Sequence, residues 1–127
     1  MSSCPCESGL DYDSCCGRYI DGGESPETAA QLMRSRYTAF TLGEIPYLQR
    51  TWHPSTRPSS VQTDDKVRWL GLKIKRTGQG GADDVEGIVE FVARYKVDGR
   101  GHRLHEISRF VKENGQWFYV DGELLPK

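Results

Sequence analysis

Residues 85–121 carry the clearest fold signal of the chain: VEGIVEFVARYKVDGRGHRLHEISRFVKENGQWFYVD. This stretch is divided by Asp98-Gly99 and Asn114-Gly115, dipeptides that favour tight two-residue turns between strands. Apolar and aromatic residues recur at alternate positions, which is the period of a strand with one buried face. Turns this short connect antiparallel neighbours. We therefore predict strands at about 85–96, 102–112 and 116–121 in one antiparallel meander.

A fourth strand is expected upstream, beginning at Val67 and ending at the glycine-rich residues 78–81. A strict two-residue alternation would place Trp69, Gly71 and Lys73 on one face of this strand. Leu70, Leu72 and Ile74 would then lie on the other face. The sheet should therefore contain about four strands.

Helical signals precede the strands. Ser25-Pro26-Glu27 favours a helix start, with Ser25 as the cap and Pro26 in the first turn, and Gly43 favours a stop after about Leu42. A shorter helix is expected within residues 45–52. Helices followed by consecutive antiparallel strands indicate an α+β fold, in which the helices pack on one face of the sheet.

All four cysteines fall near the N-terminus, in the order Cys-x-Cys, eight residues, Cys-Cys. In a reducing compartment, such clustering favours metal binding over disulfides, although a disulfide pair is the alternative. Four thiolates complete the closed tetrahedral shell of a structural zinc ion and leave no position for a substrate. We predict a zinc knuckle at residues 1–24, with Zn²⁺ held by Cys4, Cys6, Cys15 and Cys16.

Two groups of residues carry a family resemblance. Cys-Pro-Cys-x-Ser-Gly from Cys4, with Cys15-Cys16-Gly17, resembles the SEC-C zinc motif of the SecA translocation ATPase. The rest of the chain resembles the bacterial YchJ-type family through Arg34-Ser35-Arg36-Tyr37-Thr38-Ala39-Phe40, Tyr47-Leu48, Thr51-Trp52, His105-Glu106-x-Ser108-x-Phe110 and Trp117-x-Tyr119-x-Asp121-Gly122. This resemblance implies an NTF2-like domain at residues 25–127, a cone of helices packed on a curved antiparallel sheet.

The SEC-C resemblance also implies partners, because in SecA the motif meets the chaperone SecB and other acidic surfaces. The loop of that motif is usually rich in Gly and Lys. Here the corresponding positions contain Glu7, Leu10, Asp11, Asp13 and Ser14 instead, so the basic surface is missing. We therefore do not expect the partners of the SecA motif to carry over to this knuckle.

The concave side of the sheet is the candidate pocket, and we expect it to be lined by Tyr95, Glu106, Ser108, Trp117 and Tyr119. Burial among aromatic residues would raise the pKa of Glu106 toward the range of a general base. In the competing interpretation, which we favour, Glu106 forms an ion pair with Arg34 or Arg36 of the first helix.

Composition excludes several functions. The net charge is −1, and residues 1–30 carry six acids against Arg18 alone, so the remaining basic residues form only a dispersed excess. We expect no nucleic-acid partner. No run approaches the ~20 apolar residues of a membrane helix, and Met1-Ser2-Ser3-Cys4 lacks the features of an export signal, so a cytoplasmic protein is expected.

The function predicted from these features is a zinc-binding protein-binding adaptor, a monomer or weak homodimer, with no reaction assigned. The alternative is a small-molecule-binding enzyme of the isomerase or dehydratase type that uses the pocket around Glu106. An enzyme would need a working pocket, whereas an adaptor would need only an exposed docking surface on the knuckle.

Overall fold

The computed structural model describes residues 3–61 and 66–125. Four antiparallel strands form one sheet in the order β1-β2-β3-β4, as the turn signals predict. The strands are β1 (Val67–Gln79), β2 (Glu86–Val97), β3 (Arg100–Glu113) and β4 (Gln116–Leu124). Asp98-Gly99 and Asn114-Gly115 form the two tightest hairpin turns, and all four of these residues have positive φ, which Gly, Asn and Asp tolerate best.

Strand pairing is irregular at three points, and such irregularities change which side chains face inward. The register of β1 against β2 shifts between Trp69 and Gly71, so Leu70 is an extra residue and lies exposed. This bulge places Trp69 on the same face as Leu72 and Ile74. The strict alternation predicted for residues 69–74 is therefore wrong at one position. In β4, a similar shift opposite Arg109 turns Asp121 to the outer face.

Three helices of the N-terminal half are α1 (Gly17–Ile20), α2 (Ala29–Leu42) and α3 (Ile45–Arg50), and a 3-10 turn covers Tyr12–Ser14. The start predicted for the long helix is three residues early. Thr28 is the cap, because its hydroxyl accepts the N–H of Gln31 while the Gln31 amide oxygen accepts the N–H of Thr28. Gly43 ends the helix in a left-handed conformation, as predicted.

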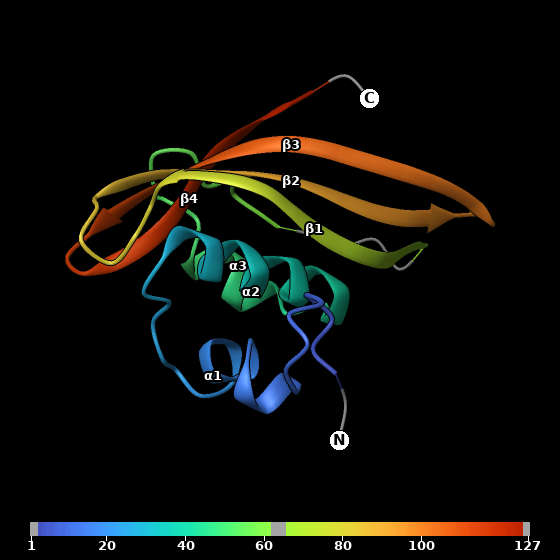
Figure 1. Ribbon diagram of the computed structural model, residues 1–127, viewed down its shortest axis with the longest axis horizontal. Coiled ribbons are helices and arrows are strands. Elements are labelled where there is room, and N and C mark those ends of the chain that lie inside the picture. The colour runs from blue at the N-terminus through green and yellow to red at the C-terminus, as the bar shows by residue number, and fades with distance from the viewer. Residues whose placement is uncertain (1–2, 62–65, 126–127) are drawn as a thin grey trace.

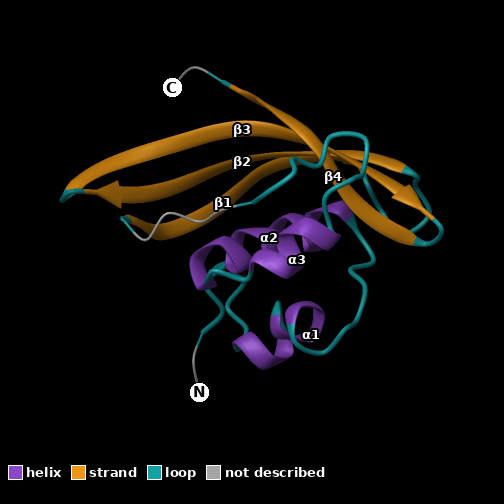
Figure 2. Cartoon of the chain, turned by 180° about the vertical axis from the view of Figure 1, so that it is seen from behind, coloured by secondary structure: helices purple, strands orange, loops and turns teal. Residues whose placement is uncertain are grey.

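The elements stack in three layers. Figure 1 shows the curved sheet over α2 and α3, with α1 and the N-terminal coil on the far side of those helices. Figure 2 shows the same order from behind. Side chains from all three layers join one buried cluster, which includes the four cysteines, Leu32, Leu48, Phe110 and Trp117. Helix α2 therefore packs on the sheet with one face and on the cysteine segment with another.

Some sequence predictions extend beyond the described residues. Residues 1–2 of the predicted knuckle, residues 62–65 of the expected loop and residues 126–127 of the predicted NTF2-like domain lie outside them. Within the described residues, no helix combines the length and the apolar character needed to cross a membrane.

Candidate metal centre and candidate pocket

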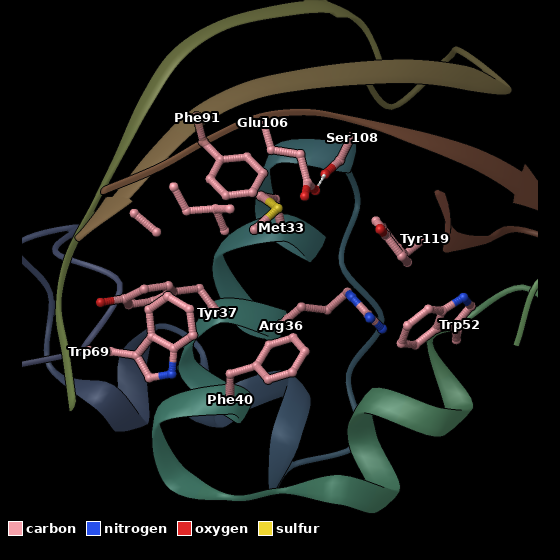
Figure 3. Close-up of a pocket in the computed structure, with 12 residues that line it drawn as sticks. Met33, Arg36, Tyr37, Phe40, Trp52, Trp69, Phe91, Glu106, Ser108 and Tyr119 are labelled. Carbon is pink, nitrogen blue, oxygen red and sulfur yellow. Dashed lines mark hydrogen bonds between the residues drawn. The ribbon is translucent and has the colours of Figure 1, made fainter. Parts of the chain in front are cut away.

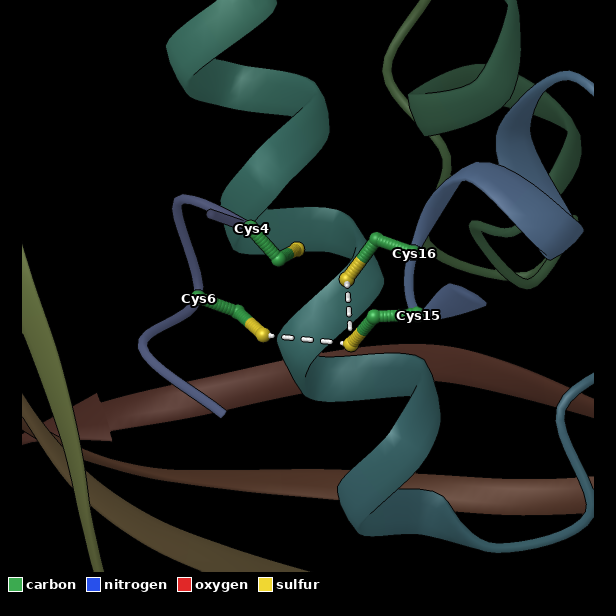
Figure 4. Close-up of side chains that lie close together, drawn as sticks. All are labelled: Cys4, Cys6, Cys15 and Cys16. Carbon is green, nitrogen blue, oxygen red and sulfur yellow. Dashed lines mark hydrogen bonds between the residues drawn. The ribbon is translucent and has the colours of Figure 1, made fainter. Parts of the chain in front are cut away.

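The four cysteines converge beside α2. Cys4 and Cys6 come from the N-terminal coil, and Cys15 and Cys16 come from the segment that enters α1 (Figure 4). All four Sγ atoms lie within 4.8 Å of one another, and every cysteine is at most 6% exposed. Two backbone hydrogen bonds close the loop of residues 4–10. The N–H of Cys4 donates to the Leu10 carbonyl, and the N–H of Glu7 donates to the Cys4 carbonyl.

The sulfur spacing suits a tetrahedral metal ion. An ideal tetrahedron with 2.3 Å zinc–sulfur bonds has edges of about 3.8 Å. Here the Sγ atoms of Cys6 and Cys15 are 3.6 Å apart, and those of Cys15 and Cys16 are 3.9 Å apart. All four cysteines are free thiols, so no disulfide occupies the cluster. The residues fit a zinc ion, which would supply a structural cross-link.

The thiols of Cys6, Cys15 and Cys16 differ in the direction of their pKa shifts. Hydrogen bonds from its neighbours, that from Cys16 foremost, lower the pKa of Cys6 below its usual range. The hydrogen bond to Cys6, together with burial, raises the pKa of Cys16, and burial raises the pKa of Cys15. One thiolate is thus already favoured in a cluster of thiols, which is the form that a metal needs as ligand.

Hydroxyl groups around the sulfurs orient them. The buried Thr38 hydroxyl of α2 donates to Cys16 Sγ at 3.2 Å and lies 3.6 Å from Cys4 Sγ. The Ser8 hydroxyl lies 3.1 Å from Cys15 Sγ. Arg34 of α2 donates from Nη1 to the Cys6 carbonyl at 2.8 Å. These contacts attach the metal-binding segment to α2 and form the outer layer of the site.

Thr38→Val is therefore expected to weaken zinc binding by roughly 10- to 100-fold, because it removes the hydroxyl that donates to Cys16 while keeping the side-chain shape. Competition with a chromophoric chelator measures this change. Thr41→Val is the matched control, because the Thr41 hydroxyl bonds only to the Thr38 carbonyl within the described residues. Equal zinc affinities for the two variants would contradict the role assigned to Thr38.

A separate cavity of about 230 Å³ lies between α2 and the concave face of the sheet (Figure 3). Most of its wall is apolar or aromatic, and its polar side chains are few. The lining residues are Met33, Arg36, Tyr37, Phe40, Trp52, Trp69, Phe91, Ala93, Leu104, Glu106, Ser108 and Tyr119. Such a wall, with a few convergent polar groups, is typical of small-molecule sites.

Arg36 is the cation of this cavity and is only 3% exposed. Its Nη1 group donates to the Leu48 carbonyl at 2.9 Å and to the Thr51 hydroxyl at 2.7 Å. The guanidinium carbon lies 5.0 Å from the Trp52 ring centre and 4.5 Å from that of Tyr119. Burial lowers the pKa of Arg36 to about 10, so it remains charged at neutral pH. Burial likewise raises the pKa of Tyr119 to about 12.

Glu106 extends into the cavity from β3, and its Oε2 accepts the Ser108 hydroxyl at 2.6 Å. Its carboxylate lies over Gly122 of β4, where a side chain would overlap it. The expected ion pair between Glu106 and an arginine of α2 is not formed: Arg34 donates to the Cys6 carbonyl, and Arg36 donates to α3 and the residue after it. Glu106 and Arg36 instead lie on opposite walls of one cavity (Figure 3).

Three of the five predicted pocket residues, Glu106, Ser108 and Tyr119, line this cavity, and two do not. Tyr95 lies farther along β2, where its ring stacks on His102 and contacts Trp69. Trp117 lies at the other end of the sheet from Tyr95. There, its Nε1–H donates to the Glu27 carbonyl at 3.0 Å. The strands are long, so residues on one face extend well beyond one cavity.

Arg36 was not predicted as a pocket residue in its own right, although the sequence carries a signal for it. Met33, Tyr37 and Phe40 follow the helical period of the buried stripe, and Arg36 lies three residues after Met33 and four before Phe40. A charged residue on an apolar helical face is rarely buried without a functional or structural reason. Thr38 carries no comparable signal, because its role depends on the path of the cysteine segment.

Comparison with known proteins agrees with this architecture. The family model described as "YchJ, middle NTF2-like domain" matches residues 28–122. A UPF0225 protein of Chromobacterium violaceum is 51% identical over 125 residues, which cover 95% of this chain and 92% of that protein.

The solution structure of a SEC-C motif containing protein from Rhodopseudomonas palustris has a TM-score of 0.84 at 32% identity, covering 97% of this chain and 98% of that one. The crystal structure of a SEC-C motif containing protein from Psychrobacter arcticus has a TM-score of 0.79 at 26% identity, covering 100% of this chain and 85% of that one. The chain therefore belongs to the YchJ-type, or UPF0225, family, with an NTF2-like domain after its N-terminal cysteine cluster.

Proposed function

We propose that this protein is a zinc-dependent adaptor, in which Cys4, Cys6, Cys15 and Cys16 hold one structural zinc ion. The observation that carries the metal proposal is the convergence of four buried Sγ atoms within 4.8 Å. Because four thiolates fill the tetrahedral shell, the ion would have no open position for catalysis. A cytoplasmic location suits four free thiols, since that compartment keeps cysteines reduced.

The adaptor proposal rests on the outer surface of the knuckle. Leu10 is 51% exposed, and Asp13 and Asp21 are exposed in the same segment. Arg18 is the only basic residue among residues 1–30. Its guanidinium bonds to the Cys15 carbonyl and the Tyr19 hydroxyl. We define this acidic surface with Leu10 as the knuckle patch; it suits a basic partner with an apolar socket.

Leu10→Ser combined with Asp13→Lys should abolish capture of such a partner, while Leu70→Ser should not. Leu70 is the matched control because it is similarly exposed, at 45%, but lies on the sheet. The full-length protein would be immobilised in lysate from a bacterium that carries the family, and captured proteins would be quantified by mass spectrometry. We expect a basic protein whose recovery falls at least about tenfold in the knuckle variant and after chelation. Capture that depends on Leu70 but not on Leu10 would contradict the adaptor proposal.

A second candidate function, an isomerase- or dehydratase-like enzyme, is favoured by one observation. Glu106 and Tyr119 line the same largely apolar cavity, where a carboxylate can act as a base. The first requirement of such an enzyme is that the cavity binds a small molecule.

A further inference from the structure

The cavity contains a buried cation without a paired anion. Within residues 3–61 and 66–125, Arg36 forms no ion pair with a carboxylate, and its Nε–H and Nη2 groups have no hydrogen-bond acceptor. A buried charge is tolerated mainly when it is paired and hydrogen-bonded. The rings of Trp52 and Tyr119 offset part of this cost, because they lie close to the guanidinium. The remaining N–H groups of Arg36 form the edge that binds a carboxylate in a bidentate manner.

The opposite wall offers an acceptor. Glu106 Oε2 is occupied by the Ser108 hydroxyl, whereas no donor in the described chain reaches Oε1. The lining residues thus carry one positive and one negative charge, on opposite walls. A ligand that matches both walls needs an anionic group for Arg36 and a hydrogen-bond donor for Glu106. A dianion such as phosphate would meet repulsion from Glu106 and has no apolar part to cover the rest of the wall.

The aromatic part of the wall and the cavity volume determine which apolar group the ligand can carry and how large the ligand can be. Tyr37, Phe40, Trp69 and Phe91 line the cavity, and the Tyr37 and Trp69 rings pack edge to face with their centres 5.7 Å apart. Aromatic walls favour a flat or ring-bearing apolar group. A volume of about 230 Å³ is below the usual range of drug-sized sites, so the ligand must be small.

We propose that this cavity binds a small carboxylic acid with an apolar ring and a hydroxyl or amino group. The carboxylate pairs with Arg36, the hydroxyl or ammonium group donates to Glu106, and the ring packs between Met33 and Trp69. This site uses the face of α2 that carries Met33, Arg36 and Phe40, whereas the metal centre uses the face that carries Arg34 and Thr38. The proposal is therefore independent of the zinc proposal and of the adaptor proposal.

Tryptophan side chains provide the readout. The chain has three tryptophans, so a ¹H–¹⁵N spectrum shows three indole N–H signals. Trp52 and Trp69 line the cavity, and Trp117 donates to the Glu27 carbonyl outside it. Full-length protein, as purified, would be titrated with mandelate, 3-phenyllactate, 4-hydroxybenzoate and phenylalanine. We expect at least one to give saturable shifts of Trp52 and Trp69 with Trp117 unchanged, and its decarboxylated analogue to bind at least about tenfold more weakly.

Two variants assign the contacts. Arg36→Lys keeps the charge but loses the planar fork, and should weaken the best acid about tenfold. Glu106→Gln keeps the side-chain shape but removes the charge, and should weaken hydroxy or amino acids relative to benzoate, which has no such donor. If Arg36→Lys does not fold, the acids and their decarboxylated analogues still test the anionic contact on the unaltered protein. Saturable shifts with none of the four acids, shifts centred on Trp117, or equal binding of acids and decarboxylated analogues would overturn the proposal.

Discussion

Replacing Cys16 by serine is expected to release the zinc ion and unfold the described part of the knuckle, residues 3–24. Cys16 is 1% exposed, and its Sγ accepts the hydroxyl of Thr38 in α2. Structural zinc contributes roughly 10–16 kcal/mol to the folding of small metal modules. Besides the cysteines, the buried apolar side chains of residues 3–24 are Tyr19 and Ile20. The zinc content per chain and the dispersion of amide signals from residues 3–24 measure the effect. We expect less than about a tenth of an equivalent of zinc and collapsed dispersion.

The matched control is Ser14→Ala, because Ser14 is exposed, lies two residues from Cys16 and forms no side-chain bond within the described residues. It should retain the zinc ion and the dispersed spectrum. The sheet should remain folded in Cys16→Ser, since α2 packs directly against β1, β2 and β4. Cooperative melting of the sheet with the knuckle would contradict the division of the chain at about residue 24.

Gly87→Ala is expected to lower the free energy of unfolding by about 2–3 kcal/mol. A Cβ atom at this position would lie 2.5 Å from the Gly80 Cα and 2.9 Å from the Gly80 nitrogen. Both are backbone atoms, so the chain must move, and it is fixed there because the Gly80 carbonyl accepts the N–H of Ala29, the first residue of α2. Urea denaturation followed by circular dichroism measures the loss.

Gly101→Ala is the matched control, because Gly101 also lies in a strand but a Cβ atom there meets nothing within 4 Å. Its effect should stay within about 0.5 kcal/mol of zero. If the two substitutions cost the same, the close approach of Gly80 and Gly87 does not hold the hairpin loop against α2.

The sheet could be predicted from sequence because its signals are local. Asp98-Gly99 and Asn114-Gly115 determine their own backbone conformations, so the turns and the strand order follow. The bulge at Leu70 could not be predicted, because an extra residue in one strand depends on its pairing with the neighbouring strand. The cap at Thr28 was missed for a related reason: Ser25 and Thr28 are both good caps, and the contact of Ala29 with Gly80 favours the second.

The metal centre and the cavity also differ in how far local sequence predicts them. The cysteines were predicted because their clustering is itself a chemical signal, and the structure brings their sulfurs together. The position of Glu106 and Tyr119 at one cavity follows from strand alternation, but the limits of the cavity do not, and Tyr95 and Trp117 lie outside it. For Arg36, the sequence predicts only an ion pair with Glu106. Its bonds to Leu48 and Thr51 depend on how α3 packs, which local sequence does not specify.

The four cysteine thiolates are expected to hold one structural zinc ion. X-ray absorption at the zinc edge, together with metal analysis, tests this on protein purified under reducing conditions without added metal. We predict one zinc per chain with four sulfur neighbours at about 2.3 Å and no nitrogen or oxygen ligand. A different metal, a zinc ion with mixed ligands, or a metal-free protein with the same folded N-terminal segment would contradict it.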